Sequence, residues 1–270
     1  MIHVRVVVGM FDGAMDDFVT VRFNDKFDPV DALFQVAAGH AYSQQSGMPL
    51  RLCFSDTEVG RCLEPYVRNV STHAGTYPSN VWYGYIGQTE MPPMKGGVTL
   101  YSRYRSASLF ARCTNSLRAL FTVADNSTNT LVLLDNIPGS NNNSKGFTSL
   151  VWLDYVLAQL KGKMQYKEPL VCGNVHAATV PTLEQHLDAG VHRYGRTPED
   201  VFNVIFNTAC GNIVMAPNLE SWWVKFLRPQ VPAVVQTEWP FSEEELNWLD
   251  ASSGAGNLSR VSVKSILGLS

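Results

Sequence analysis

Charged residues are scarce in this sequence. Asp, Glu, Lys and Arg make up 17% of its 270 residues, against a usual value of about 25% for soluble globular domains. The formal net charge is −3, which argues against a general polyanion binder, because affinity for a phosphate backbone needs several clustered cations. Asn, Ser, Thr and Gly replace the missing charge, as in residues 139–144. This composition favours a protein that packs against neighbouring chains.

Long apolar runs are missing as well. No window approaches 18 consecutive apolar residues, so no transmembrane helix is expected. Residues 1–6 lack the charged and apolar regions of a signal peptide. We therefore expect a protein that is made in the cytoplasm and does not contact a membrane.

Cysteines with disulfide or metal-site spacing are absent. The five cysteines are odd in number and contain no C-x-x-C pair, so buried thiols are expected rather than a disulfide framework. A zinc site needs about four converging ligands. The weak candidates for such a set are Cys172, His176, His192 and Cys210. We predict no metal and no cofactor.

Local catalytic motifs are also missing. The sequence contains neither a G-x-S-x-G elbow nor a G-x-x-x-x-G-K-[ST] phosphate loop. A cysteine nucleophile with a distant histidine base stays open, because such partners need not be close in sequence. Cys210, with His176 or His192 as its base, is the best candidate.

The first 54 residues alternate between strand and helix patterns. Residues 2–8 and 18–23 show period-two alternation and predict two strands in a hairpin. Asp28 and Pro29 predict the start of an amphipathic helix that ends at Gly47, and residues 50–54 predict a third strand. This order of elements resembles the β-grasp or ubiquitin-like arrangement over residues 1–86, which implies an adaptor module.

The remaining sequence divides into a region of strands and a region of helices. Aromatic and β-branched residues predict further strands from 81 to about 135, and helical spacing dominates after a polar loop at 136–145. The sequence therefore predicts an α+β fold with a β-rich domain at 1–136 and a mainly helical domain at 147–250. Residues 251–270 are expected to form a linker and a terminal strand or arm that pairs within this chain or with a neighbour.

One stretch has no negative charge. No Asp or Glu occurs from Met91 to Ala124, where basic residues alternate with aromatic ones. Guanidinium groups bind phosphates and aromatic rings stack on bases, so this stretch is a candidate binding surface for RNA or an acidic partner. The alternative is a solvated sheet face whose counter-charges come from another segment or subunit. The candidate residues are Tyr101, Arg103, Tyr104, Arg105, Arg112 and Arg118.

Three functional hypotheses follow from these observations. The composition favours a structural or assembly protein, a capsid or other virion component that forms homo- or hetero-oligomers with other protein subunits. The element order of residues 1–86 favours an adaptor with a ubiquitin-like module. A cysteine-dependent hydrolase is the third alternative, and it requires that Cys210 and a histidine meet in the fold.

Overall fold

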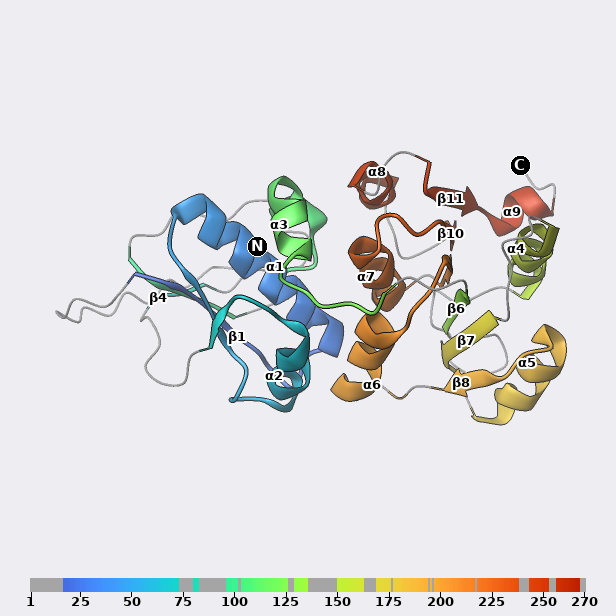
Figure 1. Cartoon of the computed structure of the whole chain (residues 1–270), viewed down its shortest axis with the longest axis horizontal. Coiled ribbons are helices and arrows are strands. Elements are labelled where there is room, and N and C mark those ends of the chain that lie inside the picture. Colours follow the sequence, from blue (N-terminus) through green and yellow to red (C-terminus); the bar gives the residue numbers. More distant parts are fainter. Residues whose placement is uncertain are drawn as a thin grey trace, which may run out of the picture. The chain divides into compact units, whose positions relative to one another are not determined.

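The chain forms two compact units, Met1–Thr122 and Val123–Ser270 (Figure 1). We analysed a computed structural model, which describes residues 17–72, 80–82, 96–101, 103–125, 129–135, 150–162, 169–175, 177–193, 195, 197–216, 218–237, 243–252 and 256–267. Among these residues, no helix is long and apolar enough to cross a membrane.

The first unit contains a five-stranded sheet. Its strands are β1 (Val19–Arg22), β2 (Leu50–Cys53), β3 (Ser71–Thr72), β4 (Asn80–Trp82) and β5 (Val98–Leu100). They lie in the order β3-β2-β1-β5-β4, and all four neighbouring pairs are parallel. Strand β1 is therefore the central strand of the sheet.

This parallel pairing contradicts the β-grasp expectation. Strand β1 pairs with β2 and β5 in parallel, so among the described residues it belongs to no hairpin. The predicted strand at residues 2–8 lies outside the described residues. Thr20 of β1 is fully buried, as is usual for strands of parallel sheets, which are covered on both faces.

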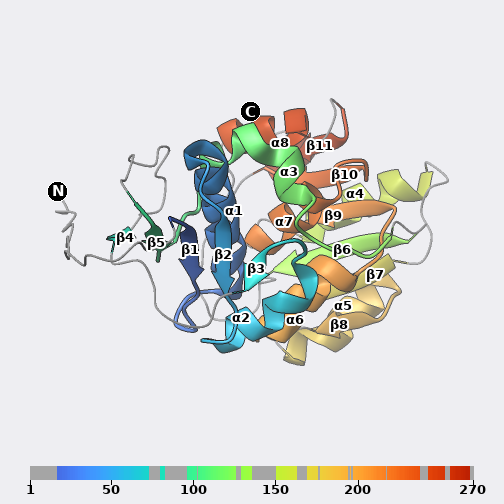
Figure 2. The same ribbon diagram turned by 60° about the vertical axis from the view of Figure 1, so that its left-hand side comes forward.

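Helix α1 (Pro29–Ser46) confirms the predicted helix almost to the residue. The Asp28 side chain accepts a hydrogen bond from the Val30 amide at its start, and Gly47 ends it in the left-handed conformation with φ 74°. The helix packs on β1 and β2 (Figure 2). Gly39 permits this close approach, because a Cβ there would lie 2.4 Å from Cγ2 of Val21.

The region after β5 is not made of strands, contrary to prediction. It consists of two 3-10 turns, η2 (Ala107–Leu109) and η3 (Ala111–Cys113), and the short helix α3 (Thr114–Arg118). The other helical elements of this unit are α2 (Glu58–Leu63) and the 3-10 turn η1 (Glu64–Tyr66).

The second unit contains a six-stranded sheet rather than helices alone. Its strands are β6 (Thr130–Asp135), β7 (Pro169–Asn174), β8 (Val191–Arg193), β9 (Asn212–Met215), β10 (Ala233–Gln236) and β11 (Leu258–Val261). Its helices are α4 (Leu150–Gly162), α5 (Val180–Leu187), α6 (Pro198–Phe202), α7 (Leu219–Leu227), α8 (Glu243–Ser252) and α9 (Val263–Ile266), with a 3-10 turn η4 (Ala177–Thr179) and a π-helix η5 (Asn203–Asn207). The mixed α and β composition is confirmed, while the mainly helical C-terminal part is a doubly wound α/β unit.

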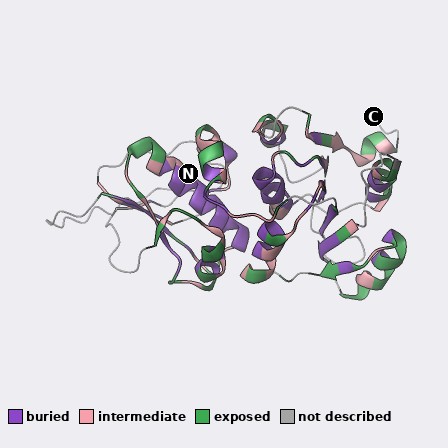
Figure 3. Ribbon diagram, in the orientation of Figure 1, coloured by how far each residue is buried: buried purple, intermediate pink, exposed green. Residues whose placement is uncertain are grey.

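The second sheet is parallel throughout and lies in the order β11-β10-β9-β6-β7-β8. Counted from β6, this is the strand order 3-2-1-4-5-6 of dinucleotide-binding Rossmann folds. Figure 1 shows helices on both sides of it, α4, α5 and α9 on one face and α6 and α7 on the other. Figure 3 colours most of α7 as buried, as its residues Ser221–Leu227 are.

The division between the units precedes β6, rather than falling at residue 136. Strand β6 pairs with both β7 and β9 at the centre of the second sheet, so it cannot belong to the first unit. The terminal strand pairs within this chain, because β11 lies parallel to β10.

Candidate functional site

The topology of the first sheet indicates where a ligand would bind. In open parallel sheets, ligands bind outside the carboxyl ends of the strands, at the point where the chain connections turn to opposite sides. In the first unit, the chain leaves β1 toward β2 on one side of the sheet, and β5 is the neighbour of β1 on the other side. The point where the connections diverge therefore lies between β1 and β5. The residues that follow β1 and β5 therefore form the candidate site.

Side chains of the loop after β1, residues 23–28, form hydrogen bonds within the loop and to neighbouring segments. The Asn24 carboxamide accepts a hydrogen bond from the Lys26 amide at 3.0 Å and donates one of 2.7 Å to the Tyr101 hydroxyl. Asp25 accepts bonds from the Glu58 and Val59 amides at the start of α2. These bonds tie the loop to the segment after β5 and to α2.

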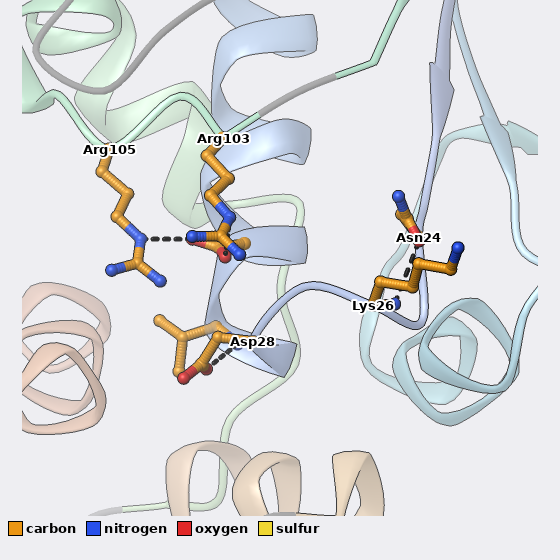
Figure 4. Close-up of polar contacts among 7 residues, drawn as sticks. Asn24, Lys26, Asp28, Arg103 and Arg105 are labelled. Atoms are coloured by element: carbon orange, nitrogen blue, oxygen red, sulfur yellow. Dashed lines mark hydrogen bonds and ion pairs between the residues drawn. The ribbon is translucent and has the colours of Figure 1, made fainter.

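Two arginines of the segment after β5 converge on one carboxylate of α1 (Figure 4). Arg105 donates from Nε to Oδ1 of Asp31, and Nε of Arg103 lies 3.4 Å from Oδ2 as an ion pair. The Asp31 side chain is fully buried, whereas those of Arg103 and Arg105 are 42% and 26% exposed. A buried carboxylate is thus paired with two guanidinium groups that reach the surface.

Aromatic rings support the guanidinium groups at this edge. The Arg103 guanidinium lies 4.8 Å from the centroid of the Phe27 ring, and that of Arg22 lies 5.9 Å from the Tyr101 ring. The Phe27 and Tyr101 centroids are 6.3 Å apart. Such stacking contributes about 0.5–1 kcal/mol at exposed sites and restrains the orientation of the cation.

The structure separates the six predicted binding residues. Tyr101, Arg103 and Arg105 belong to the candidate site, but Tyr104 is fully buried and its hydroxyl donates to the Trp82 carbonyl at 2.9 Å. Arg112 in η3 and Arg118 in α3 belong to elements that contact α1, where Ser116 of α3 forms a hydrogen bond of 2.8 Å with His40. Burial lowers the pKa of Arg118 to about 10.

Sequence reasoning missed Asp31, Asn24 and Phe27. The absence of acids from Met91 to Ala124 did require a counter-charge from another segment, and Asp31, more than 70 residues earlier, is that counter-charge. No local pattern distinguishes it, because acidic residues are common in the first turn of any helix.

The cysteine and histidine candidates do not form a site among the described residues. No group of three potential metal ligands occurs there, and His176 lies outside the described part of the chain. Cys172 is the register partner of His192 on neighbouring strands, but the cysteine is buried and the histidine exposed. Burial raises the pKa of Cys172 to about 11 and that of Cys210 above its ordinary value, which is the opposite of what a thiolate nucleophile requires.

These thiols should therefore react slowly. At pH 8, iodoacetamide is expected to alkylate Cys113 and Cys172 at least about tenfold more slowly in the native chain than in urea, because a pKa of about 11 leaves little thiolate. Cys210 should also react more slowly in the native chain, because burial raises its pKa. Peptide mapping by mass spectrometry measures each rate. Labelling of native Cys210 faster than a free thiol would contradict this and restore the cysteine-hydrolase hypothesis.

The second sheet has its own switch point, between β6 and β9. Helix α7 begins directly after β9, where the buried Asn218 side chain accepts a hydrogen bond of 2.8 Å from the Ser221 amide. The Ser221 hydroxyl, also buried, has no hydrogen-bond partner among the residues that the structure describes. Residues 136–149, which follow β6, lie outside them.

No protein family model matches this chain, and no curated protein matches it. Solved structures of the NodZ α-1,6-fucosyltransferase resemble it. The structure soaked with GDP-fucose is 11% identical, with a TM-score of 0.43, over 80% of this chain and 94% of that one. The structure co-crystallised with GDP is 12% identical, with a TM-score of 0.44, over 81% and 94%. Selenomethionine NodZ from Bradyrhizobium is 11% identical, with a TM-score of 0.41, over 81% and 94%.

The expectation of a capsid or other virion component is wrong, because the described strands form two parallel sheets. The jelly rolls of viral capsids are antiparallel. A low-charge composition reflects the surface of a protein and does not determine its fold class.

Proposed function

We propose that this chain is a small-molecule-binding α/β protein of the type that includes many enzymes, and that its first unit binds an anionic group of the ligand. The site lies between the carboxyl ends of β1 and β5. The observation that carries the proposal is the convergence of Arg103 and Arg105 on Asp31 at the switch point of a parallel sheet.

The residue types suit an oxyanion. A guanidinium group presents five N–H donors in a planar fork that matches carboxylate and phosphate oxygens. The contact of Arg103 with Asp31 is made through Nε at 3.4 Å, and the side chain is 42% exposed over the Phe27 ring. An incoming carboxylate or phosphate can therefore be bound at the outer side of this guanidinium.

Titration of the chain with inorganic phosphate and with acetate at low salt tests this proposal. Arg103→Gln and Arg105→Gln should each weaken binding by about tenfold, because each removes a charge-assisted contact. Isothermal calorimetry or NMR shift titration measures the affinities. Arg112→Gln removes an exposed arginine of the same basic stretch and is the matched control, with unchanged affinity expected. Saturable binding that survives both site substitutions, or no binding by the unaltered chain, would contradict the proposal.

The second candidate function is nucleotide binding in the second unit, between β6 and β9. The strand order 3-2-1-4-5-6 carries it, and the buried Ser221 hydroxyl, which has no partner within the described ranges, lies in the first turn of the helix after β9. Nucleoside diphosphates should raise the melting temperature of the Arg103→Gln/Arg105→Gln double variant as much as that of the unaltered chain. A shift that the double variant abolishes would assign the nucleotide to the first unit instead.

A further inference from the structure

The segment that carries Arg103 is fixed to the sheet on both sides of that residue. The Tyr101 amide donates to the Trp82 carbonyl at 3.2 Å, and the hydroxyl of the fully buried Tyr104 donates to the same oxygen at 2.9 Å. Trp82 is the last residue of β4, and Tyr101 directly follows β5. These two bonds restrict the position from which the Arg103 side chain starts.

The turn after β1 places an aromatic ring against the guanidinium group of Arg103. The Asn24 side chain accepts a hydrogen bond of 3.0 Å from the Lys26 amide (Figure 4), and the Asn24 carbonyl accepts one of 3.0 Å from the Phe27 amide. Asparagine favours such turns because its side chain bonds to the backbone two residues on. The Phe27 ring centroid lies 4.8 Å from Cζ of Arg103, so the turn at Asn24 sets the position of the ring that supports this cation.

One hydrogen bond joins the turn to the fixed segment. The Asn24 carboxamide donates to the Tyr101 hydroxyl at 2.7 Å, across 77 positions of the sequence. The rings of Phe27 and Tyr101 also lie against each other, with centroids 6.3 Å apart. The residue that forms the turn is thus the one that connects it to the segment after β5.

We infer that Asn24 is a positioning residue, whose turn and bond to Tyr101 hold the Phe27 ring against Arg103 and so orient the guanidinium group before an anion arrives. The inference rests on the proposed anion site, and Asn24 acts there through Phe27 and Arg103 rather than on the ligand. Such pre-organisation raises affinity, because binding no longer costs the entropy of ordering the side chain.

The ligand-free chain provides the first test. The ring current of Phe27 should displace the NMR signal of the Arg103 Nε–H proton, and this signal is identified by its absence from the Arg103→Gln variant. Phe27→Leu removes the ring and gives the signal of an unsupported guanidinium group. We expect Asn24→Ala and Tyr101→Phe each to move the signal toward that position, because each removes the hydrogen bond between the turn and the fixed segment.

Titration with acetate measures the effect on binding. Phe27→Leu should weaken the affinity by about two- to fivefold, which is the effect of one exposed cation–ring contact. Asn24→Ala should weaken it by a factor between that loss and the loss of about tenfold expected for Arg103→Gln, because Asn24 acts only through these two side chains. Tyr101→Phe should have a smaller effect in the Asn24→Ala background than in the unaltered chain, since the bond between the two residues is then already lost.

Ser43→Ala is the matched control. It removes a side-chain hydrogen bond of 2.6 Å to the Met48 carbonyl at the other end of α1, so it reveals effects of a general loss of stability. We expect it to change neither the Arg103 signal nor the affinity for acetate.

The outcomes separate the two proposals. An Arg103 signal that stays in place in the Asn24→Ala variant contradicts the positioning role, whether or not an anion binds. A displaced signal with unchanged affinity for acetate overturns that role as well. Failure of the unaltered chain to bind acetate and phosphate contradicts the anion site itself, and the Arg103 signal then still decides whether Asn24 orients the guanidinium group.

Discussion

Arg228→Met is expected to lower the free energy of unfolding of the second unit by about 3–5 kcal/mol, the largest effect of any substitution proposed for this chain. The Arg228 side chain is buried and donates from Nη1 to the Ile205 carbonyl at 2.7 Å and from Nη2 to the Thr208 carbonyl at 2.8 Å. A longer bond of 3.3 Å reaches the Phe206 carbonyl.

These carbonyls lie at the end of the π-helix η5, where the last turn of a helix has no internal donors left. Burial lowers the pKa of Arg228, although the adjacent Cys210 opposes that shift. Methionine fills a similar space and donates nothing, so the Ile205 and Thr208 carbonyls would lose the bonds from Arg228, whereas the Phe206 carbonyl would keep its bond of 2.7 Å from the Ala124 amide. Arg228→Lys keeps the charge but cannot reach all three, and an intermediate loss is expected.

Urea unfolding followed by tryptophan fluorescence measures this effect, because five of the six tryptophans lie in the second unit. Arg260→Met is the matched control. Its guanidinium makes an ion pair of 2.8 Å with the largely exposed Glu243, and a pair of that kind contributes about 0–1 kcal/mol. Equal losses for the two variants would show that Arg228 has no special role.

Gly60→Ala should destabilise the first unit by about 2–4 kcal/mol. A Cβ at this position of α2 would lie 2.4 Å from the Phe54 carbonyl oxygen and 2.9 Å from two further backbone atoms of Phe54. Backbone atoms cannot rotate away as a side chain can, so the helix must move. Helix propensity alone would predict that alanine raises the stability of the unit by about 1 kcal/mol. We expect a loss of stability instead, because the steric contact with the Phe54 backbone outweighs this gain.

Scanning calorimetry of the full chain measures this change. Gly190→Ala is the control, because a Cβ at that position would meet no atom of the described residues within 4 Å and the backbone there is not left-handed. We expect that substitution to be neutral or to stabilise the chain by up to about 1 kcal/mol. Equal thermal stability of the Gly60→Ala variant and the unaltered chain would show that α2 has room to shift.

Local signals predicted the individual elements well. Asp28, Pro29 and Gly47 defined α1 because caps and left-handed glycines act over a few residues. Strands β1 and β2 were predicted from the sequence patterns of residues 18–23 and 50–54, which are also local signals. The region after β5 was predicted as strands from its aromatic residues, but Tyr104, Phe110 and Leu117 are buried from turns and a short helix, and burial of large side chains does not require a strand.

The candidate site was predicted only in part. Tyr101, Arg103 and Arg105 were identified because an acid-free basic stretch is visible in composition. Their separation from Arg112 and Arg118 was not visible, because it depends on how the chain turns after β5. Asp31 was missed because its pairing joins residues 72 and 74 positions apart, and no local pattern encodes such a contact.

The sequence by itself determined the low charge, the bounds of α1 and the need for a distant counter-charge to the basic stretch. Tertiary structure alone decided that the strands pair in parallel, that β6 belongs to the second sheet and that Asp31 meets the two arginines. The physical reason is the range of the interactions. Capping and turn conformations are set by neighbouring residues, whereas strand pairing and ion pairing are set by free energies that depend on the whole packed chain.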